Sequence, residues 1–224
     1  MSFLIKDLEL ALKSISLDGF KFKKVIGGFQ WIQKLPNRTN IIGVGHSGYP
    51  DLYRTSRPSL RVSYDEVEDI LDRVYKETEI KKNFEDRSTI KGDTRNIVDV
   101  NYKVFDIHIK DKLNYPQVLM ELKKIIQQSA LPFFQECNSL EKIAELLADK
   151  TPQEVVPYIQ GAILFPKTIL ILKLSNHPSF NTKLLEYYGV LKKQAEKKDT
   201  YKDVLTVFLE LFKDDLKNLK SPLA

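Results

Sequence analysis

The chain has 224 residues, of which 42% are hydrophobic and 29% charged, and its formal net charge is +5 at neutral pH. This length and composition predict a globular protein with a sizeable core. Cys137 is the only cysteine, which excludes an intramolecular disulfide and a four-cysteine zinc site. The N-terminus lacks a signal-peptide pattern, and no apolar stretch reaches the roughly 20 residues that a spanning helix needs, so we expect a cytoplasmic protein without membrane association.

The first predicted elements are an amphipathic helix and a β-hairpin. Apolar residues recur at helical spacing from Leu4 to Ile15, and Gly19 is placed to end the helix. Two adjacent glycines, Gly27 and Gly28, predict a two-residue turn, because both can take a positive φ. The hairpin then has one aromatic face and one basic face. Counting outward from this turn gives the cross-strand pairs Lys24–Trp31, Phe22–Gln33, Phe20–Leu35 and Lys21–Lys34.

Further strands and an acidic helix follow the hairpin. Residues 40–46 predict a third strand, residues 45–58 a Gly-, Pro-, Ser- and Tyr-rich loop around a short strand at 52–55, and residues 60–62 another strand. The sequence Ser63-Tyr64-Asp65-Glu66 is typical of a capping box, which starts a helix that ends near Thr78. Seven acids lie between residues 62 and 79, against two basic residues.

The rest of the chain predicts one more strand and then helices. Residues 98–109 alternate in strand fashion, with Phe105 on one side and Asp106 and His108 on the other. Capping sequences predict helices from Ser139 and from Thr151, and amphipathic helices follow at 179–195 and 200–219. The segment 160–174 fits a buried strand or a buried helix, and its helical surroundings favour the helix.

Together these elements predict an α+β fold. We expect an antiparallel sheet with helices packed on one face, followed by an all-helical C-terminal region. The predicted division is an α+β domain over residues 1–130 and a helical region over residues 131–224, packed on the first as one unit.

Parts of the sequence resemble a bacterial family. The leading helix, the run Gly19-Phe20-Lys21-Phe22-Lys23-Lys24 and the strand that ends Trp31-Ile32-Gln33 resemble the start of the bacterial domain-of-unknown-function family number 4304. The run Leu131-Pro132-Phe133-Phe134, followed by Ser139-Leu140-Glu141, is also similar to that family. The resemblance implies an α+β fold with a helical C-terminal part, and it implies no activity and no catalytic residue.

The predicted binding surface combines the basic face of the hairpin with the Tyr- and Arg-rich stretch after it. Between Gly19 and Arg61 the sequence holds eight basic side chains and a single acid, Asp51. Tyrosine and arginine are enriched at interface hot spots, and loops often carry binding residues. We therefore expect a non-catalytic protein-binding module with an immunity-like or regulatory accessory role. Its surface residues are Lys21, Lys23, Lys34, Tyr49, Tyr53, Arg54, Arg57 and Arg61.

Three alternatives stay open at this stage. The basic face could bind nucleic-acid phosphates, although aromatic residues on the opposite face suit base stacking poorly. An enzyme site could form near His46 or His108. The acidic helix at 62–79 could instead neutralise the basic face. No metal, cofactor or nucleophile motif appears, so we predict no catalytic residue, no metal and no cofactor, and the sequence predicts no oligomeric state.

Overall fold

The structure is a computed structural model. It describes residues 3–49, 52–80, 87–92, 94, 100–105, 108–109, 115–159 and 161–220. The chain divides into two compact units, of which unit 1 holds residues 1–62 and 91–135 and unit 2 holds residues 63–90 and 136–224. This division differs from the expected boundary at residue 130, because the acidic helix after residue 62 belongs with the C-terminal helices.

The α+β fold class is confirmed, with an antiparallel sheet and a helical C-terminal region. Strands β1 (Lys21–Val25), β2 (Gly28–Leu35), β3 (Arg38–Tyr49), β4 (Leu52–Thr55) and β7 (His108–Ile109) follow one another in that order across the sheet. Strand β5 (Ser59–Tyr64) pairs with β3 and with β6 (Ile90–Gly92). The strand pairs β1–β2, β2–β3, β3–β4 and β4–β7 are all antiparallel.

The hairpin turn lies one residue earlier than predicted. Val25 pairs with Gly28, so the turn residues are Ile26 and Gly27, and Gly27 alone takes a positive φ of 73°. Gly28 lies in β2, where a Cβ atom would come 2.5 Å from the Val44 carbonyl oxygen. The second glycine is therefore needed for a close approach of two strands and not for the turn.

This earlier turn changes the cross-strand partners but not the faces of the hairpin. Phe22 pairs with Trp31, and Lys21 pairs with Ile32, so the predicted opposition of Lys21 and Lys34 is wrong. Because each pairing shifts by two residues, every side chain keeps its predicted face. The aromatic face and the basic face are thus where the sequence pattern put them.

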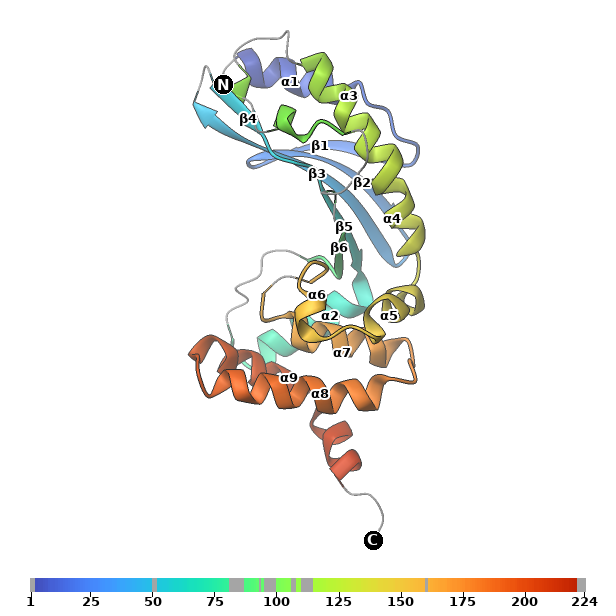
Figure 1. Cartoon of the computed structure of the whole chain (residues 1–224), viewed down its shortest axis with the longest axis vertical. Helices are drawn as coiled ribbons and strands as arrows, with labels where there is room; N and C mark the ends of the chain where they lie inside the picture. The colour runs from blue at the N-terminus through green and yellow to red at the C-terminus, as the bar shows by residue number, and fades with distance from the viewer. Residues whose placement is uncertain are drawn as a thin grey trace. The chain divides into compact units, whose positions relative to one another are not determined.

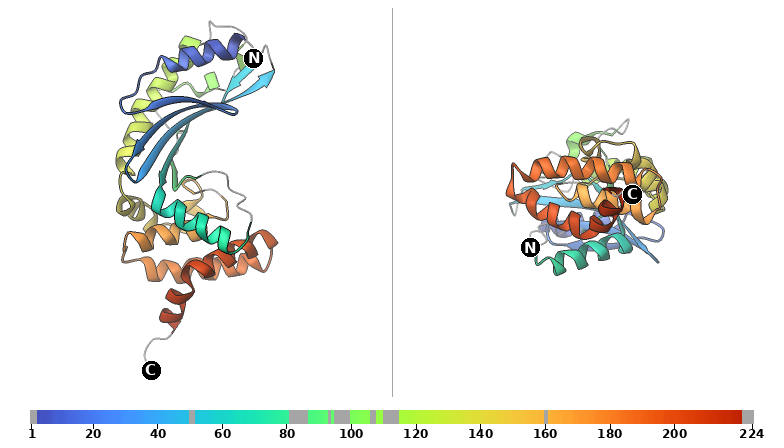
Figure 2. Two further views of the ribbon diagram at one scale, coloured as in Figure 1. Left: turned by 180° about the vertical axis from the view of Figure 1, so that it is seen from behind. Right: turned by 90° about the horizontal axis from the view of Figure 1, so that it is seen from below.

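Helices cover the aromatic face of the sheet in unit 1. Helix α1 (Phe3–Lys13) leads to Ile15, whose carbonyl accepts a 3.1 Å hydrogen bond from the buried Trp31 Nε1, and Glu9 of α1 pairs with Lys24 at 2.5 Å. Figures 1 and 2 show α1 and α3 (Tyr115–Ile125) on the same side of β1–β3. A π-helical turn (Ile126–Ala130) joins α3 to α4 (Leu131–Glu136), and the ring of Phe134 packs 5.8 Å from that of Phe20.

One predicted loop and one predicted strand have a different structure from the one expected. Residues 47–49, expected in a loop, extend β3, and residues 46–49 pair with β4. Residues Tyr102–Phe105, expected in a strand, form the 3₁₀ helix η1, while His108 and Ile109 form β7. Asp106, expected beside His108, lies outside the described residues.

Unit 2 is built around one helix that is buried on all sides. Helix α7 (Leu164–Leu174) contacts α2 (Asp65–Glu77), α5 (Leu140–Ala148), α6 (Pro152–Val155), α8 (Phe180–Ala195) and α9 (Asp199–Lys220). This confirms the helical reading for residues 164–174 of the ambiguous segment. Helices α8 and α9 form a long antiparallel pair (Figure 2). No helix of the described ranges is long and apolar enough to cross a membrane.

The helix starts in unit 2 test the predicted caps. Thr151 and Glu154 form the expected capping box of α6, and Ser139 caps α5. The capping box predicted at Ser63 is wrong, because Ser63 is a buried residue of β5 and the N-cap of α2 is Tyr64, which makes no side-chain cap. The Tyr64 backbone N–H instead donates to Thr89 Oγ1 at 2.8 Å.

Replacing Gly189, in the middle of α8, by alanine is expected to stabilise the protein slightly. A Cβ atom at this position would meet nothing within 4 Å, and alanine costs less conformational entropy in a helix than glycine. We expect Gly189→Ala to raise the free energy of unfolding by roughly 0.5–1 kcal/mol. Urea denaturation measures this; an unchanged or lower midpoint would contradict it.

Candidate functional site

The sheet face opposite α1 carries five of the eight predicted surface residues. Side chains alternate along each strand, so the residues that neighbour buried Trp31, Ile42 and Val44 point the other way. Register then places Arg54 on this face as well, because it pairs with Ser47, while its neighbour Thr55 is buried on the helix-covered side. We call this surface the open face. Its basic residues are Lys21, Lys23, Lys34, Arg54 and Arg61.

Gly43 lies near the centre of the open face and lets two side chains cross it. A Cβ atom on Gly43 would come 2.8 Å from Ser59 Oγ and 3.5 Å from Arg61 Nη2. Arg61 of β5 therefore extends its guanidinium over the backbone of β3. This places a cation in line with Gln30, which pairs with Gly43, and with Lys23, which pairs with Gln30.

The strands that build the open face hold no acidic residue at all. The sequences of β1 to β5 contain lysine and arginine but neither Asp nor Glu. Lys21, Lys23 and Lys34 are exposed. Among the residues that the structure describes, no carboxylate forms an ion pair with any of these three lysines. The open face is thus a positive surface without internal compensation at these positions.

Half-buried aliphatic side chains lie between the lysines. Ile32 pairs with Lys21 on one side and with Ile41 on the other, and both isoleucines are partly exposed. The residues of β1 and β2 on this face include no aromatic side chain, since Phe22, Phe29 and Trp31 pack together on the covered face. The open face therefore offers cations around an aliphatic centre.

The remaining predicted surface residues are placed differently. Arg57 follows β4, and its guanidinium lies 5.3 Å from the ring centroid of Tyr102. Tyr49 and Tyr53 are strand residues of β3 and β4 and not loop residues, and their side chains lie outside what the structure describes. Whether these tyrosine side chains contact the lysines lies outside the described residues.

His46, the first candidate for an enzyme site, lies on the covered face. Its ring centroid is 5.5 Å from that of the buried Phe29. Burial, and then the charge of Lys24, lower the pKa of His46 below its ordinary value, so the imidazole is neutral at neutral pH. The side chain of His108 lies outside the described residues, and Cys137 is fully buried. Within the described ranges, no group of three or more His, Cys, Asp or Glu side chains could hold a metal ion.

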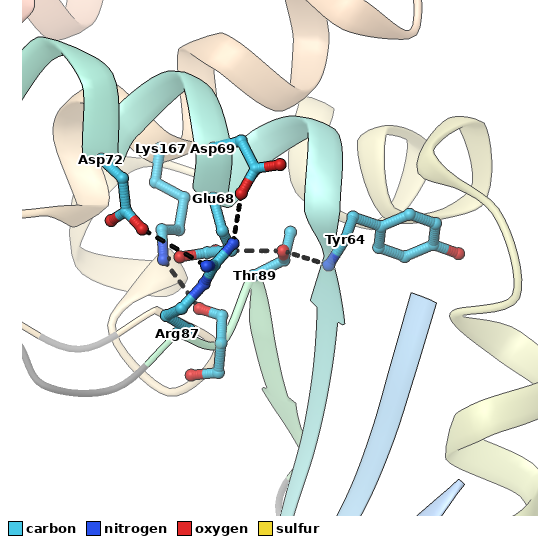
Figure 3. Close-up of polar contacts among 8 residues, drawn as sticks. Tyr64, Glu68, Asp69, Asp72, Arg87, Thr89 and Lys167 are labelled. Carbon is cyan, nitrogen blue, oxygen red and sulfur yellow. Dashed lines mark hydrogen bonds and ion pairs between the residues drawn. The ribbon is translucent and has the colours of Figure 1, made fainter. Parts of the chain in front are cut away.

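The acidic helix α2 has cationic partners within its own unit. Glu68 forms a 2.8 Å ion pair with Lys167 of α7, and Arg87 forms ion pairs with Asp69 and Asp72 (Figure 3). These contacts supply local partners for three of the acids that the sequence offered as compensation for the basic face. They favour an open face on which the charges of Lys21, Lys23 and Lys34 are available to a partner.

The Glu68–Lys167 pair is the centre of a buried polar cluster that the sequence did not indicate. Lys167 Nζ also donates to the Ser88 carbonyl at 2.8 Å, and Thr89 Oγ1 donates to Glu68 Oε1 at 3.1 Å (Figure 3). The side chains of Glu68 and Lys167 are 1% and 4% exposed. The cluster ties α2, α7 and the segment before β6 together, and its burial leaves no access for a substrate.

A second feature missed from the sequence is a hollow of about 500 Å³ on the outside of α2. Three acids and three cations line it, and two of the acids already bind Arg87, whose pKa is raised chiefly by its hydrogen bond to Asp69. The lining residues are Asp69, Asp72, Arg73, Lys76, Glu77 and Arg87. This balanced lining favours neither an anion nor a cation.

Comparison of the chain with family models, with curated proteins and with solved structures found no match. The resemblance to the domain-of-unknown-function family therefore stays a prediction.

Proposed function

We propose that this protein is a non-catalytic binding module that holds an acidic partner protein on the open face of its unit 1 sheet. The observation that carries the proposal is the set of exposed lysines Lys21, Lys23 and Lys34 on strands that contain no acid. An immunity-like or regulatory accessory role fits such a module, because either role requires binding without chemistry.

The aliphatic centre of the open face favours a protein over a nucleic acid. Protein interfaces combine a desolvated apolar centre with a polar rim, and Ile32 and Ile41 lie among the lysines in this way. A reader of single-stranded nucleic acid gains much of its affinity from bases stacked on aromatic rings. The aromatic residues of β1 and β2 are instead packed under α1, where they cannot stack on a base.

Reversing the three lysine charges should release the partner. In the variant Lys21→Glu/Lys23→Glu/Lys34→Glu, the attraction of each exposed pair, about 0.2–1 kcal/mol, is replaced by repulsion. We expect at least about a tenfold loss of partner binding, since 1.4 kcal/mol corresponds to a factor of ten. Affinity capture from native extract, with nuclease treatment and quantification of the captured protein, measures this.

A control variant with the same charge change separates the surface from total charge. Lys193, Lys197 and Lys198 are exposed at the end of α8 and after it, and their replacement by Glu should leave capture unchanged. Equal loss in both variants would show that only net charge matters. Capture that disappears on nuclease treatment would overturn the proposal in favour of a nucleic-acid partner.

A further inference from the structure

Strand β1 is one end of the sheet, and no described strand pairs with its outer backbone edge. In the strand order, β1 pairs with β2 alone. The His46 N–H donates to the Gly27 carbonyl at 2.8 Å, which shows that this carbonyl points toward β3. Backbone groups alternate in direction along an antiparallel strand, so those of Gly28 point toward β1.

The same alternation identifies the backbone groups on the outer edge. Val25, Lys23 and Lys21, which pair with Gly28, Gln30 and Ile32, direct their N–H and C=O groups toward β2. Phe22 lies between two of them and directs its own N–H and C=O away from the sheet. In the part of the chain that the structure describes, neither group of Phe22 has a hydrogen-bond partner.

We infer that the partner contributes an extended acidic segment that adds to the sheet beside β1. This inference rests on the proposed function and specifies its geometry. Strand addition supplies main-chain hydrogen bonds to Phe22, and side chains at alternate positions give specificity. Acidic residues two positions apart in the segment face Lys21 and Lys23, and the residue between them lies next to the ring of Phe22.

The lysines also decide against a second copy of this chain as the occupant. Antiparallel pairing of two β1 strands centred on Phe22 sets Lys21 opposite the Lys23 of the other copy, and pairing centred on Lys23 sets that residue against itself. Like charges directly opposite are destabilising, and lysine on an edge strand is a common protection against such pairing. The same lysine charges attract an acidic strand. The charge on the β1 edge therefore favours an acidic segment over a second copy of β1.

The test uses three synthetic peptides and the full chain. The first alternates glutamate with valine, the second has lysine in place of glutamate, and the third keeps the first sequence but carries N-methyl groups on its backbone. We expect the first to bind, the second not to bind, and the third to bind at least about tenfold more weakly than the first, because it keeps the charges but loses main-chain donors.

Amide hydrogen exchange gives the residue-level measurement. Binding of the first peptide should slow exchange at the Phe22 amide at least about tenfold, while the amides of Lys21 and Lys23, already bonded to β2, change little. No binding by the first peptide, or equal binding by the first and third with unchanged exchange at Phe22, would overturn strand addition. The proposed function is decided separately by the lysine variant and its control, so the two failures are distinguishable.

Discussion

Replacing Lys167 by methionine is expected to destabilise unit 2 by roughly 3–5 kcal/mol, because it leaves a buried carboxylate without its counter-charge. Glu68 is almost fully buried, and its described partners are Lys167 and the hydroxyl of Thr89. The substitution also removes the donor to the Ser88 carbonyl. Urea denaturation, followed by circular dichroism, measures the loss.

Two comparisons make this result specific. Lys173, six residues further along α7, pairs with Asp215 at 2.7 Å but is 41% exposed, so Lys173→Met should cost no more than about 1 kcal/mol. The double variant Lys167→Met/Glu68→Gln removes both charges and should recover part of the loss, since Gln can still accept from Thr89. If Lys167→Met and Lys173→Met lower the free energy of unfolding equally, burial of the ion pair does not determine the cost of losing it.

Gly28→Ala is expected to destabilise unit 1 by about 3 kcal/mol, which is the upper end of the usual cost of overpacking. The added Cβ atom would lie 2.5 Å from the Val44 carbonyl oxygen and 3.0 Å from the Gly45 Cα atom. Both neighbours are backbone, so β2 and β3 must separate where Gly28 pairs with Gly45. The thermal midpoint of unfolding should fall accordingly.

Gly27→Ala is the matched comparison for this effect. Its Cβ atom would meet nothing within 4 Å, but its φ of 73° is unfavourable for an L side chain. The expected cost is roughly 1–2 kcal/mol, less than that of Gly28→Ala. If Gly28→Ala proves as mild as a surface substitution, the close contact between β2 and β3 is not as described.

The faces of the hairpin could be predicted, but its exact turn could not. Alternation of side chains depends on a period of two, so a shift of the pairing by two residues leaves Lys21, Lys23 and Lys34 on the same face. The choice between Gly27 and Gly28 as turn residues depends on the approach of β3, which local sequence does not contain. The open face could therefore be predicted from pattern alone, while its cross-strand partners could not.

The errors after the hairpin have the same origin. Gly45 suggested the start of a loop, yet it lies in β3. Its backbone N–H donates a 2.7 Å hydrogen bond to Ser56 Oγ. Ser63 suggested a helix cap, yet Thr89, far along the chain, binds the backbone at that helix start. Tertiary contacts overrode both local signals. The Glu68–Lys167 pair joins residues 99 positions apart, and no single-sequence pattern links them.

That separation has a consequence for synthesis of the chain. Unit 2 begins at residue 63 but lacks α7 until the chain has been made through residue 174, whereas all of unit 1 has been made by residue 135. At roughly 5–20 residues per second, the ribosome leaves α2 without its partner helix for several seconds. During that interval Glu68 stays hydrated and the apolar side of α2 is available to chaperones. Unit 1, with its basic sheet, can fold first.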